Sequence, residues 1–368
     1  MTFGSYQGMR IFSATCLAIL LKSPILRGQA GKEILLTSEN AYNPIPSPDG
    51  KLIAYVRTGW GREGGSGGFG RSNLVSEVAI FDSEGKPMKG FPSVDSFLAG
   101  WSSDGQVLVL YRDLRYRLVT LDGKIVLQGQ LRDPQGAMRT ERVFYLRDVN
   151  EIGWSRVGEG PETVLETSTH TIARHAGWIG ENVVPSPSGR YLAVFGSTSQ
   201  TELFVYDLRL STWSDLGPLT VHPDPDRDYM KPTWSPWFAD SSRLAFVSSS
   251  TLVISDPQGK SRRTMQVRGN PGLAAPSPDG NAIAYVTIEP TPMKERPDLF
   301  FYGGTTIWIQ PLALDQIAVA ATKSSEKTYD LRWLNNTALI FDRIEDAAFA
   351  KHLRLWKVSA PRIEGWKH

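Results

Sequence analysis

A short turn motif followed by an apolar strand recurs along this chain of 368 residues. Three close copies begin at Pro46, Pro185 and Pro276, read Pro-Ser-Pro-Asp-Gly or Pro-Ser-Pro-Ser-Gly, and lead into apolar-rich segments. Looser copies begin at Trp101, Trp234 and Trp333. A turn-plus-strand unit that returns about every 40–55 residues indicates an architecture built by radial repetition.

The segments between these turns predict strands rather than helices. Beyond residue 31, apolar residues alternate with a period of two in short runs bounded by Gly, Pro, Asp, Asn and Ser, and no amphipathic helix of three turns is found. The runs group in fours and predict an all-β, seven-bladed β-propeller over residues 31–360. The third group, between residues 143 and 166, lacks the turn motif, so a six-bladed ring with an insertion at that place remains an alternative.

The last group of strands ends one strand short of four. The segment Glu33–Thr37 precedes the first turn motif and belongs to no group of its own. We expect it to pair as the outer strand of the last blade, because this pairing closes the ring and removes the free edges of an open array. Residues 361–368 are then a C-terminal tail.

One copy of the repeat carries a family resemblance. Residues Ser47–Tyr55 read Ser-Pro-Asp-Gly-Lys-Leu-Ile-Ala-Tyr, which resembles the TolB-type, WD-like propeller repeat, Trp-Ser-Pro-Asp-Gly-Lys-x-Ile-Ala-Phe. The resemblance extends as repeats over nearly all of residues 33–358 and implies a β-propeller, while the leading Trp is replaced by Pro in the three closest copies. The chain has no room for the additional N-terminal α/β domain of TolB, so the role of TolB in the Tol–Pal envelope system is not expected to transfer.

Residues 1–30 have the composition of an export signal. Arg10 precedes the apolar run Ile11–Leu21, which is too short to span a bilayer comfortably, and Gly28-Gln29-Ala30 places small residues before a cleavage site. We therefore expect a periplasmic or secreted protein with no transmembrane segment in the mature chain and a possible envelope association; an uncleaved short anchor is the alternative. The only cysteine, Cys16, lies in this segment, so the mature chain would lack disulfides and thiol chemistry.

The charge balance excludes nucleic acid as an expected partner. The chain carries 40 Lys and Arg against 38 Asp and Glu. Without residues 1–30, which hold three of the basic residues and none of the acidic ones, the net charge is −1. Nucleic-acid binding normally needs a basic patch or stripe.

The long loops predict where recognition takes place. In a four-stranded blade, the loops between the second and third strands and those between blades emerge on the same face. The longest expected loops, Thr58–Ser76, Glu289–Thr305, Ile344–His352, Thr169–Glu181 and Thr220–Lys231, are of these two classes. Long loops on one side of a rigid scaffold usually carry binding residues. We predict that a protein or peptide partner binds there through Trp60, Arg62, Phe69, Arg71, His222, Asp226, Arg227, Tyr229, Arg296, Phe301 and Tyr302.

No motif in the chain predicts catalysis. Gly64–Gly68 matches the Gly-x-Ser-x-Gly pattern, but the strand, strained turn and helix that a nucleophile elbow needs are not expected there. The alternating acids Asp224, Asp226 and Asp228 lack the glycine and glutamate of an EF-hand. We predict a non-enzymatic protein without cofactor or bound metal.

Two alternatives to a protein-binding scaffold stay open. One is a carbohydrate-active enzyme, a polysaccharide lyase or a glycoside hydrolase, with carboxylates converging over the central channel. The other is a small-ligand or metal-binding protein, in which His170, His222 and His352 approach the channel from different blades. The oligomeric state stays undetermined.

Overall fold

In a computed structural model of the chain, strands and turns account for all the regular structure that is described. The described residues are 31–60, 74–89, 91, 94–112, 115–130, 142–146, 151–158, 160–197, 201–220, 235–269, 271–292, 300–313, 317–324, 327–347 and 350–361. They contain 27 strands, which pair in antiparallel order into seven sheets.

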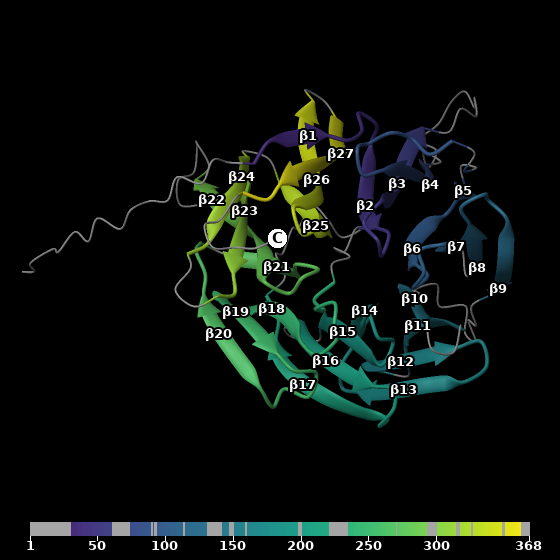
Figure 1. Cartoon of the computed structure of the whole chain (residues 1–368). Helices are drawn as coiled ribbons and strands as arrows, with labels where there is room; N and C mark the ends of the chain where they lie inside the picture. The colour runs from purple at the N-terminus through teal and green to yellow at the C-terminus, as the bar shows by residue number, and fades with distance from the viewer. Residues whose placement is uncertain are drawn as a thin grey trace, which may run out of the picture.

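Each sheet is one blade, and the blades follow the sequence around the ring (Figure 1). From the centre outward, the strands of the first three blades are β2 (Ala41–Pro46), β3 (Leu52–Trp60), β4 (Leu74–Asp82) and β5 (Val94–Asp95); β6 (Phe97–Trp101), β7 (Val107–Arg112), β8 (Arg115–Thr120) and β9 (Ile125–Gln130); and β10 (Arg142–Leu146), β11 (Glu151–Val157), β12 (Glu162–Thr167) and β13 (Thr171–Ala176).

The fourth blade contains β14 (Gly180–Pro185), β15 (Tyr191–Ser197), β16 (Thr201–Asp207) and β17 (Thr212–Pro218), and the described strands of the fifth are β18 (Leu244–Ser248), β19 (Thr251–Ser255) and β20 (Arg262–Gln266). The sixth contains β21 (Pro271–Pro276), β22 (Ala282–Pro292), β23 (Phe300–Pro311) and β24 (Val319–Ser324), and the seventh β25 (Thr328–Asn335), β26 (Ala338–Ala347), β27 (Ala350–Ser359) and β1 (Glu33–Leu35).

The prediction of an all-β, seven-bladed propeller is confirmed. The six-bladed alternative is wrong, because residues 142–176 form a complete four-stranded blade without the turn motif. The ring closes as expected from the N-terminal strand. In β1, Glu33 lies opposite Val358 and Leu35 opposite Trp356 of β27, and the backbone N–H of Leu36 donates to the carbonyl of Leu355 at 2.8 Å.

The turn motif forms the same hydrogen bonds wherever its sequence is intact. In the first blade, the hydroxyl of Ser47 donates to Asp49 Oδ1 (2.7 Å) and accepts from the N–H of Leu52 (3.0 Å), and the N–H of Gly50 donates to the Ser47 carbonyl (2.9 Å). Gly50 takes a φ of 69°, a left-handed conformation that glycine adopts without a steric penalty. The copies that begin at Trp101 and Pro276 repeat this set of bonds through Ser102 and Ser277.

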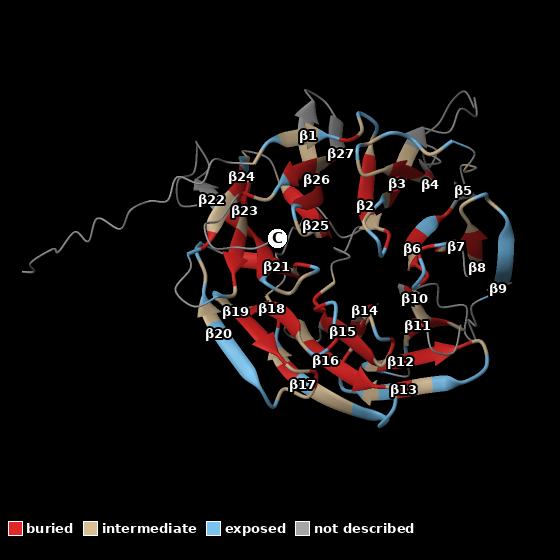
Figure 2. Cartoon of the chain, in the orientation of Figure 1, coloured by how far each residue is buried: buried red, intermediate tan, exposed pale blue. Residues whose placement is uncertain are grey.

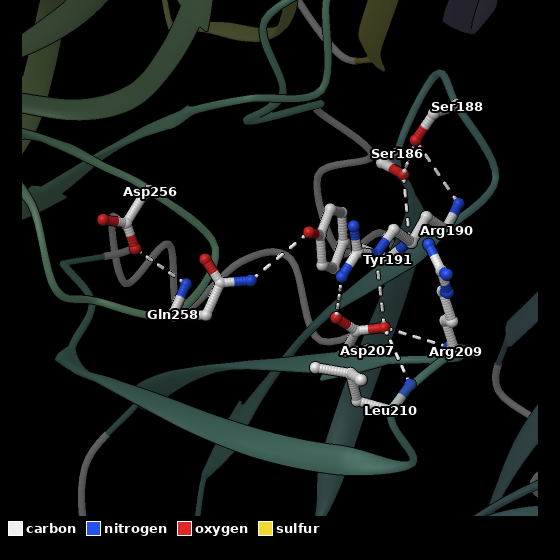
Figure 3. A network of polar contacts seen from close by, with 9 residues as sticks. All are labelled: Ser186, Ser188, Arg190, Tyr191, Asp207, Arg209, Leu210, Asp256 and Gln258. Carbon is white, nitrogen blue, oxygen red and sulfur yellow. Dashed lines mark hydrogen bonds and ion pairs between the residues drawn. The ribbon is translucent and has the colours of Figure 1, made fainter.

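The fourth blade shows how the turn works without its carboxylate (Figure 3). Ser188 stands where the other close copies have Asp, and its Oγ lies 3.2 Å from the Oγ of Ser186. Asp207, at the end of β16, accepts from Arg190 at 2.7 Å and from the backbone N–H of Arg209 at 2.9 Å. The turn between the first two strands is thereby tied to the turn between the last two on the same face of the ring.

The hydrophobic core lies between neighbouring blades. Buried residues are concentrated in the inner and middle strands, whereas the outer strands are exposed, as in β9 and β20, or only partly buried (Figure 2). Between the fourth and fifth blades, for example, Tyr191 and Trp237 stack with ring centroids 5.9 Å apart and planes at 20°. Tryptophans in or beside strands are predicted from the sequence to pack between blades. Trp101, Trp237 and Trp333 do so, and each is nearly inaccessible to solvent.

Three sequence-based assignments are corrected. The sequence pattern predicts Lys89–Pro92 as the fourth strand of the first blade. The structure forms this strand at Val94–Asp95 instead, because the chain first returns to β4 through the bridge from Pro87 to Phe81. The expected loop Thr169–Glu181 contains the outer strand β13, whose largely polar, exposed sequence hides the alternation. In the fifth blade, the repeat begins at Trp237 rather than Trp234, which lies outside the described residues. Ser241 there adopts a φ of 61° in the place of the turn glycine.

Candidate binding face

Three consecutive blades carry elongated hairpins between their second and third strands. The pairing extends to Trp60 opposite Leu74 in the first blade, to Pro292 opposite Phe300 in the sixth, and to Ala347 opposite Ala350 in the seventh. These strands are 9 to 12 residues long, whereas the corresponding strands of the second to fifth blades have 5 to 7. Because the sixth, seventh and first blades are neighbours in the closed ring, the three hairpins stand along one arc of one face, the hairpin face.

The described parts of the loops expected at these places are therefore strand. Pro290 and Pro292 led us to expect a loop at the end of β22, since proline cannot donate to a sheet ladder. The structure accommodates Pro290 beside an irregularity in the pairing of β22 with β23. In the seventh blade, Glu345 and Asp346 lie opposite His352 and Lys351 and extend the sheet with polar residues.

Three of the eleven predicted binding residues lie on the elongated hairpins. Trp60 is the last residue of β3, and Phe301 and Tyr302 lie in β23 opposite Thr291 and Pro290. The other eight lie outside the described residues: Arg62, Phe69, Arg71, His222, Asp226, Arg227, Tyr229 and Arg296.

A polar cluster lies on the inner strands beside these hairpins. Asp330 and Arg332 come from β25, Asp342 from β26, and Tyr42 and Asn43 from β2. The backbone N–H of Asn43 donates to Asp342 Oδ2 at 3.4 Å, and its side-chain amide donates to the carbonyl of Leu98 at 3.1 Å. Asn43 therefore connects the seventh, first and second blades, and we call these five residues the channel cluster.

Two members of the channel cluster lie where the backbone of an inner strand is irregular. Asn43 and Asp330 have φ values of 52° and 37°, in the left-handed region that is unusual for residues other than glycine. Both lie where the inner strand shifts register against its neighbour, between Tyr42 and Ile45 in β2 and between Tyr329 and Arg332 in β25. Extra residues in an inner strand re-aim its side chains, and such bulges occur frequently beside functional sites.

The electrostatics of the channel cluster follow from its burial. Burial lowers the pKa of Arg332 to about 10, while the carboxylates of Asp330 and Asp342 act in the opposite direction. Arg332 therefore remains protonated at neutral pH. Burial also raises the pKa of Tyr42, against the hydrogen bond from Ser76. Asp330 and Asp342 are buried, whereas Arg332 keeps partial exposure.

An aromatic pair lies at the start of the next inner strand. Phe97, the first residue of β6, is 37 % exposed, and its ring centroid lies 5.6 Å from that of Tyr111. Tyr111 also interacts electrostatically with Tyr42 of the channel cluster. Inner strands begin on the hairpin face, so exposed aromatic surface and a charged cluster occur together at this end of the ring. Aromatic residues and arginine are the side chains enriched in protein interfaces.

The sequence reasoning missed the channel cluster and Phe97. The available signal was a set of charges inside apolar strand segments, Asp330 and Arg332 in Tyr-Asp-Leu-Arg-Trp and Asp342 in Ile-Phe-Asp-Arg. Charged residues at such positions are seldom buried unless they are paired or functional.

The structure contradicts one of the three members of the suggested histidine site over the channel. His170 lies in the turn between β12 and β13, where its Nδ1 is 2.9 Å from Thr169 Oγ1, and that turn belongs to the face opposite the hairpins. His352 lies in the β26–β27 hairpin, and His222 is outside the described residues. Among the residues that the structure describes, no three His, Cys, Asp or Glu side chains gather closely enough to hold a metal ion.

Comparison with solved structures agrees with the fold. The β-propeller domain of Cps50 (Swd1) from Myceliophteria thermophila aligns with 89 % of this chain and 100 % of its own at 14 % identity and a TM-score of 0.57. A eukaryotic initiation factor covers 89 % of this chain and 88 % of its own at 16 % identity and a TM-score of 0.42. A putative TolB from Agrobacterium tumefaciens covers 74 % of this chain and 93 % of its own at 14 % identity and a TM-score of 0.42.

The alignment with the Cps50 (Swd1) domain agrees with the propeller fold that the turn motif predicted. No family model matches the sequence, and no curated protein matches it. At these identities, the likeness concerns the fold alone. Within the described residues, no helix has the length and apolarity needed to cross a membrane.

Proposed function

We propose that this protein is an exported, non-enzymatic propeller scaffold that binds a protein or peptide partner on the hairpin face. The observation that carries the proposal is the run of three elongated hairpins in neighbouring blades, beside the channel cluster and the exposed Phe97. A rigid ring that presents extended loops on one side is an arrangement typical of recognition.

The chemistry of the hairpin face fits a polypeptide ligand. The partially exposed Arg332 offers a charged donor, and Phe97 with Tyr111 offers an aromatic surface. A loop or terminus of a partner that enters the ring from this side would meet both.

A crosslinking capture from the native cell envelope tests the proposal. Replacing Trp60, Arg62, Phe301 and Tyr302 with alanine should abolish recovery of a stoichiometric partner, and Phe97→Ala should weaken it. The matched control is the pair Leu210→Ala and Ile317→Ala, because both residues are exposed aliphatics in turns of the opposite face. Loss of the partner in the control pair, with retention in the hairpin variants, would show that the partner binds on the face opposite the hairpins. That result would overturn the proposal.

Export and the absence of catalysis have separate tests. The mass of the protein recovered from the periplasm or medium should correspond to a chain that begins at Gly31. Recovery of the full-length chain from the cytoplasm would overturn export. Turnover of any member of a panel of acidic and neutral oligosaccharides by the purified protein would overturn the non-enzymatic assignment.

A further inference from the structure

The outer strand of the second blade has an unprotected edge. Among the described strands, β9 pairs with β8 alone, so within this part of the chain its other edge presents unpaired backbone groups. Proteins normally guard such edges with charges, proline or shortness. Other outer strands follow this rule: β20 carries Arg262 and Arg263, β24 carries Lys323, and β5 has only two residues. β9 reads Ile-Val-Leu-Gln-Gly-Gln, with neither charge nor proline.

The apolar side chains of β9 are open to solvent. Ile125, Val126 and Leu127 are 45, 52 and 39 % exposed, and most of the strand is coloured as exposed in Figure 2. The position of β9 at the rim separates this surface from the hairpin face and the channel cluster (Figure 1).

The neighbouring strand β8 places positive charge on one face of the β8–β9 pair. Arg115 lies opposite Gln130 and Arg117 opposite Gln128 in the register of β8 with β9. Residues directly opposite one another project from the same face of a sheet, so two arginines and two glutamines share one face. Neither Arg115 nor Arg117 forms an ion pair with an acidic residue in the described part of the chain.

The other face of the pair is apolar. Leu118 lies opposite Leu127, and Tyr116 lies opposite Gly129, against which its ring packs so closely that a Cβ at residue 129 would be 2.4 Å from the tyrosine Oη. The ring of Tyr116 thus covers β9 at Gly129, where a side chain on β9 would clash with it. The pairing of β8 with β9 shifts register once, between Leu118 and Val119.

We propose that the free edge of β9 binds an extended segment of a partner protein, which adds a strand to the second blade. Backbone hydrogen bonds to β9 would supply affinity, and the alternation of side chains would supply specificity. The charge of Arg115 and Arg117 selects a segment with acidic residues at every second position and aliphatic residues between them. The acidic side chains then lie on the arginine face and the aliphatic ones beside Leu127.

A second copy of the chain is the less favourable occupant. Antiparallel pairing of two β9 edges about a two-fold axis would place Arg115 and Arg117 of both copies on the same face of one continuous sheet. Like charges gathered on one face oppose association, whereas an acidic partner segment complements them.

The experiment uses the full protein and a synthetic eight-residue peptide in which glutamate alternates with valine. A peptide in which lysine alternates with valine is the probe control. Fluorescence anisotropy should show binding of the acidic peptide only, weakened by added salt because exposed charges are screened. Hydrogen exchange should show new protection of the β9 amides and none at the outer strand β20.

Three variants make the test specific. Val126→Lys introduces a guarding charge on an exposed residue and should remove binding without unfolding the protein, and Arg115→Gln with Arg117→Gln should weaken it about fivefold to tenfold. Leu210→Lys, the same change at another exposed aliphatic, should leave binding unaltered. Equal affinity for both peptides, or no protection of β9 at millimolar acidic peptide, would overturn the proposal. So would a concentration-dependent dimer that Val126→Lys abolishes, since it would identify a second copy as the occupant.

Discussion

The indole Nε1 of Trp101 donates a 2.8 Å hydrogen bond to the backbone carbonyl of Ile45, which immediately precedes Pro46 in the neighbouring blade. The same bond joins Trp237 to Val184, before Pro185, and Trp333 to Ala275, before Pro276. Every Pro-headed copy of the turn motif is thus followed by a Trp-headed copy whose indole reaches back to it. The replacement of Trp by Pro in the closest copies therefore reflects a division of roles between paired blades.

This relationship predicts a graded effect at Trp101. Trp101→Phe should keep most of the packing and lose the donor, which costs about 1–2 kcal/mol of unfolding free energy. Trp101→Ala should cost about 3–5 kcal/mol, since it also leaves a cavity. Equilibrium urea unfolding measures both. Trp213→Phe is the control, because Trp213 donates to the Arg174 carbonyl from the exposed outer strand β17 and should lose less.

The contact between the seventh and first blades makes a second prediction at Gly50. A Cβ at this residue would lie 2.3 Å from the carbonyl oxygen of Leu334 in the seventh blade, and φ is 69°. Gly177 has a similar φ of 80°, but nothing lies within 4 Å of its Cβ position. Gly177→Ala should therefore cost only the backbone strain, about 1 kcal/mol. Gly50→Ala should cost clearly more in the same thermal or urea unfolding experiment, and equal losses would show that the blade contact does not matter.

The fold was predictable because its determinants are local and repeated. Ser47, Gly50 and the apolar strand that follows form one unit whose hydrogen bonds lie within a few residues, so the sequence pattern and the structure coincide. The sequence did not predict β13 and placed β5 at the wrong residues. Outer strands bury one side at most, so their alternation of apolar and polar residues is weak. Trp234 was mistaken for the head of the fifth repeat because Ser241, rather than a glycine, supplies the left-handed turn residue.

The candidate site was less predictable, since it depends on contacts between distant residues. Asn43 is hydrogen-bonded to Asp342, which lies 299 residues away in the sequence. No local sequence pattern shows that the strands of these two residues are neighbours in the ring. Segments with proline or acidic residues at the ends of β22 and β26 were interpreted as loops, although the backbone there continues as strand. The spacing of the strand segments predicted three of the five long insertions on this face, but not their extended structure.

Closure of the ring predicts a strong dependence on the N-terminal strand. Arg343 of β26 donates to both carboxylate oxygens of Glu33 in β1, at 2.7 and 3.3 Å, and its side chain is only 7 % exposed. Glu33→Gln should destabilise the protein, because it leaves a nearly buried guanidinium without its counter-charge. A double-mutant cycle with Arg343→Met should give a coupling of about 1–3 kcal/mol. A coupling near zero would mean that the backbone pairing of β1 alone closes the ring.

The turn motif also predicts how stability depends on pH. The hydroxyl of Ser47 and the backbone N–H of Lys51 lower the pKa of Asp49 below its reference value of 3.8, and Ser102 and the N–H of Gln106 do the same for Asp104. A carboxylate whose pKa is lower in the folded protein stabilises it at pH values above the unfolded pKa. That contribution is lost as the pH falls below about 3.8 through the folded pKa.

Unfolding free energies measured between pH 7 and pH 2 should therefore fall steeply below pH 4. The double variant Asp49→Asn and Asp104→Asn should be less stable at neutral pH and should show a shallower acid dependence. Ser188→Asp makes the opposite change, because it restores a carboxylate to the one close copy that lacks it, and the acid dependence should become steeper. If both variants follow the wild-type pH profile, the acid sensitivity arises from carboxylates outside the turn motif.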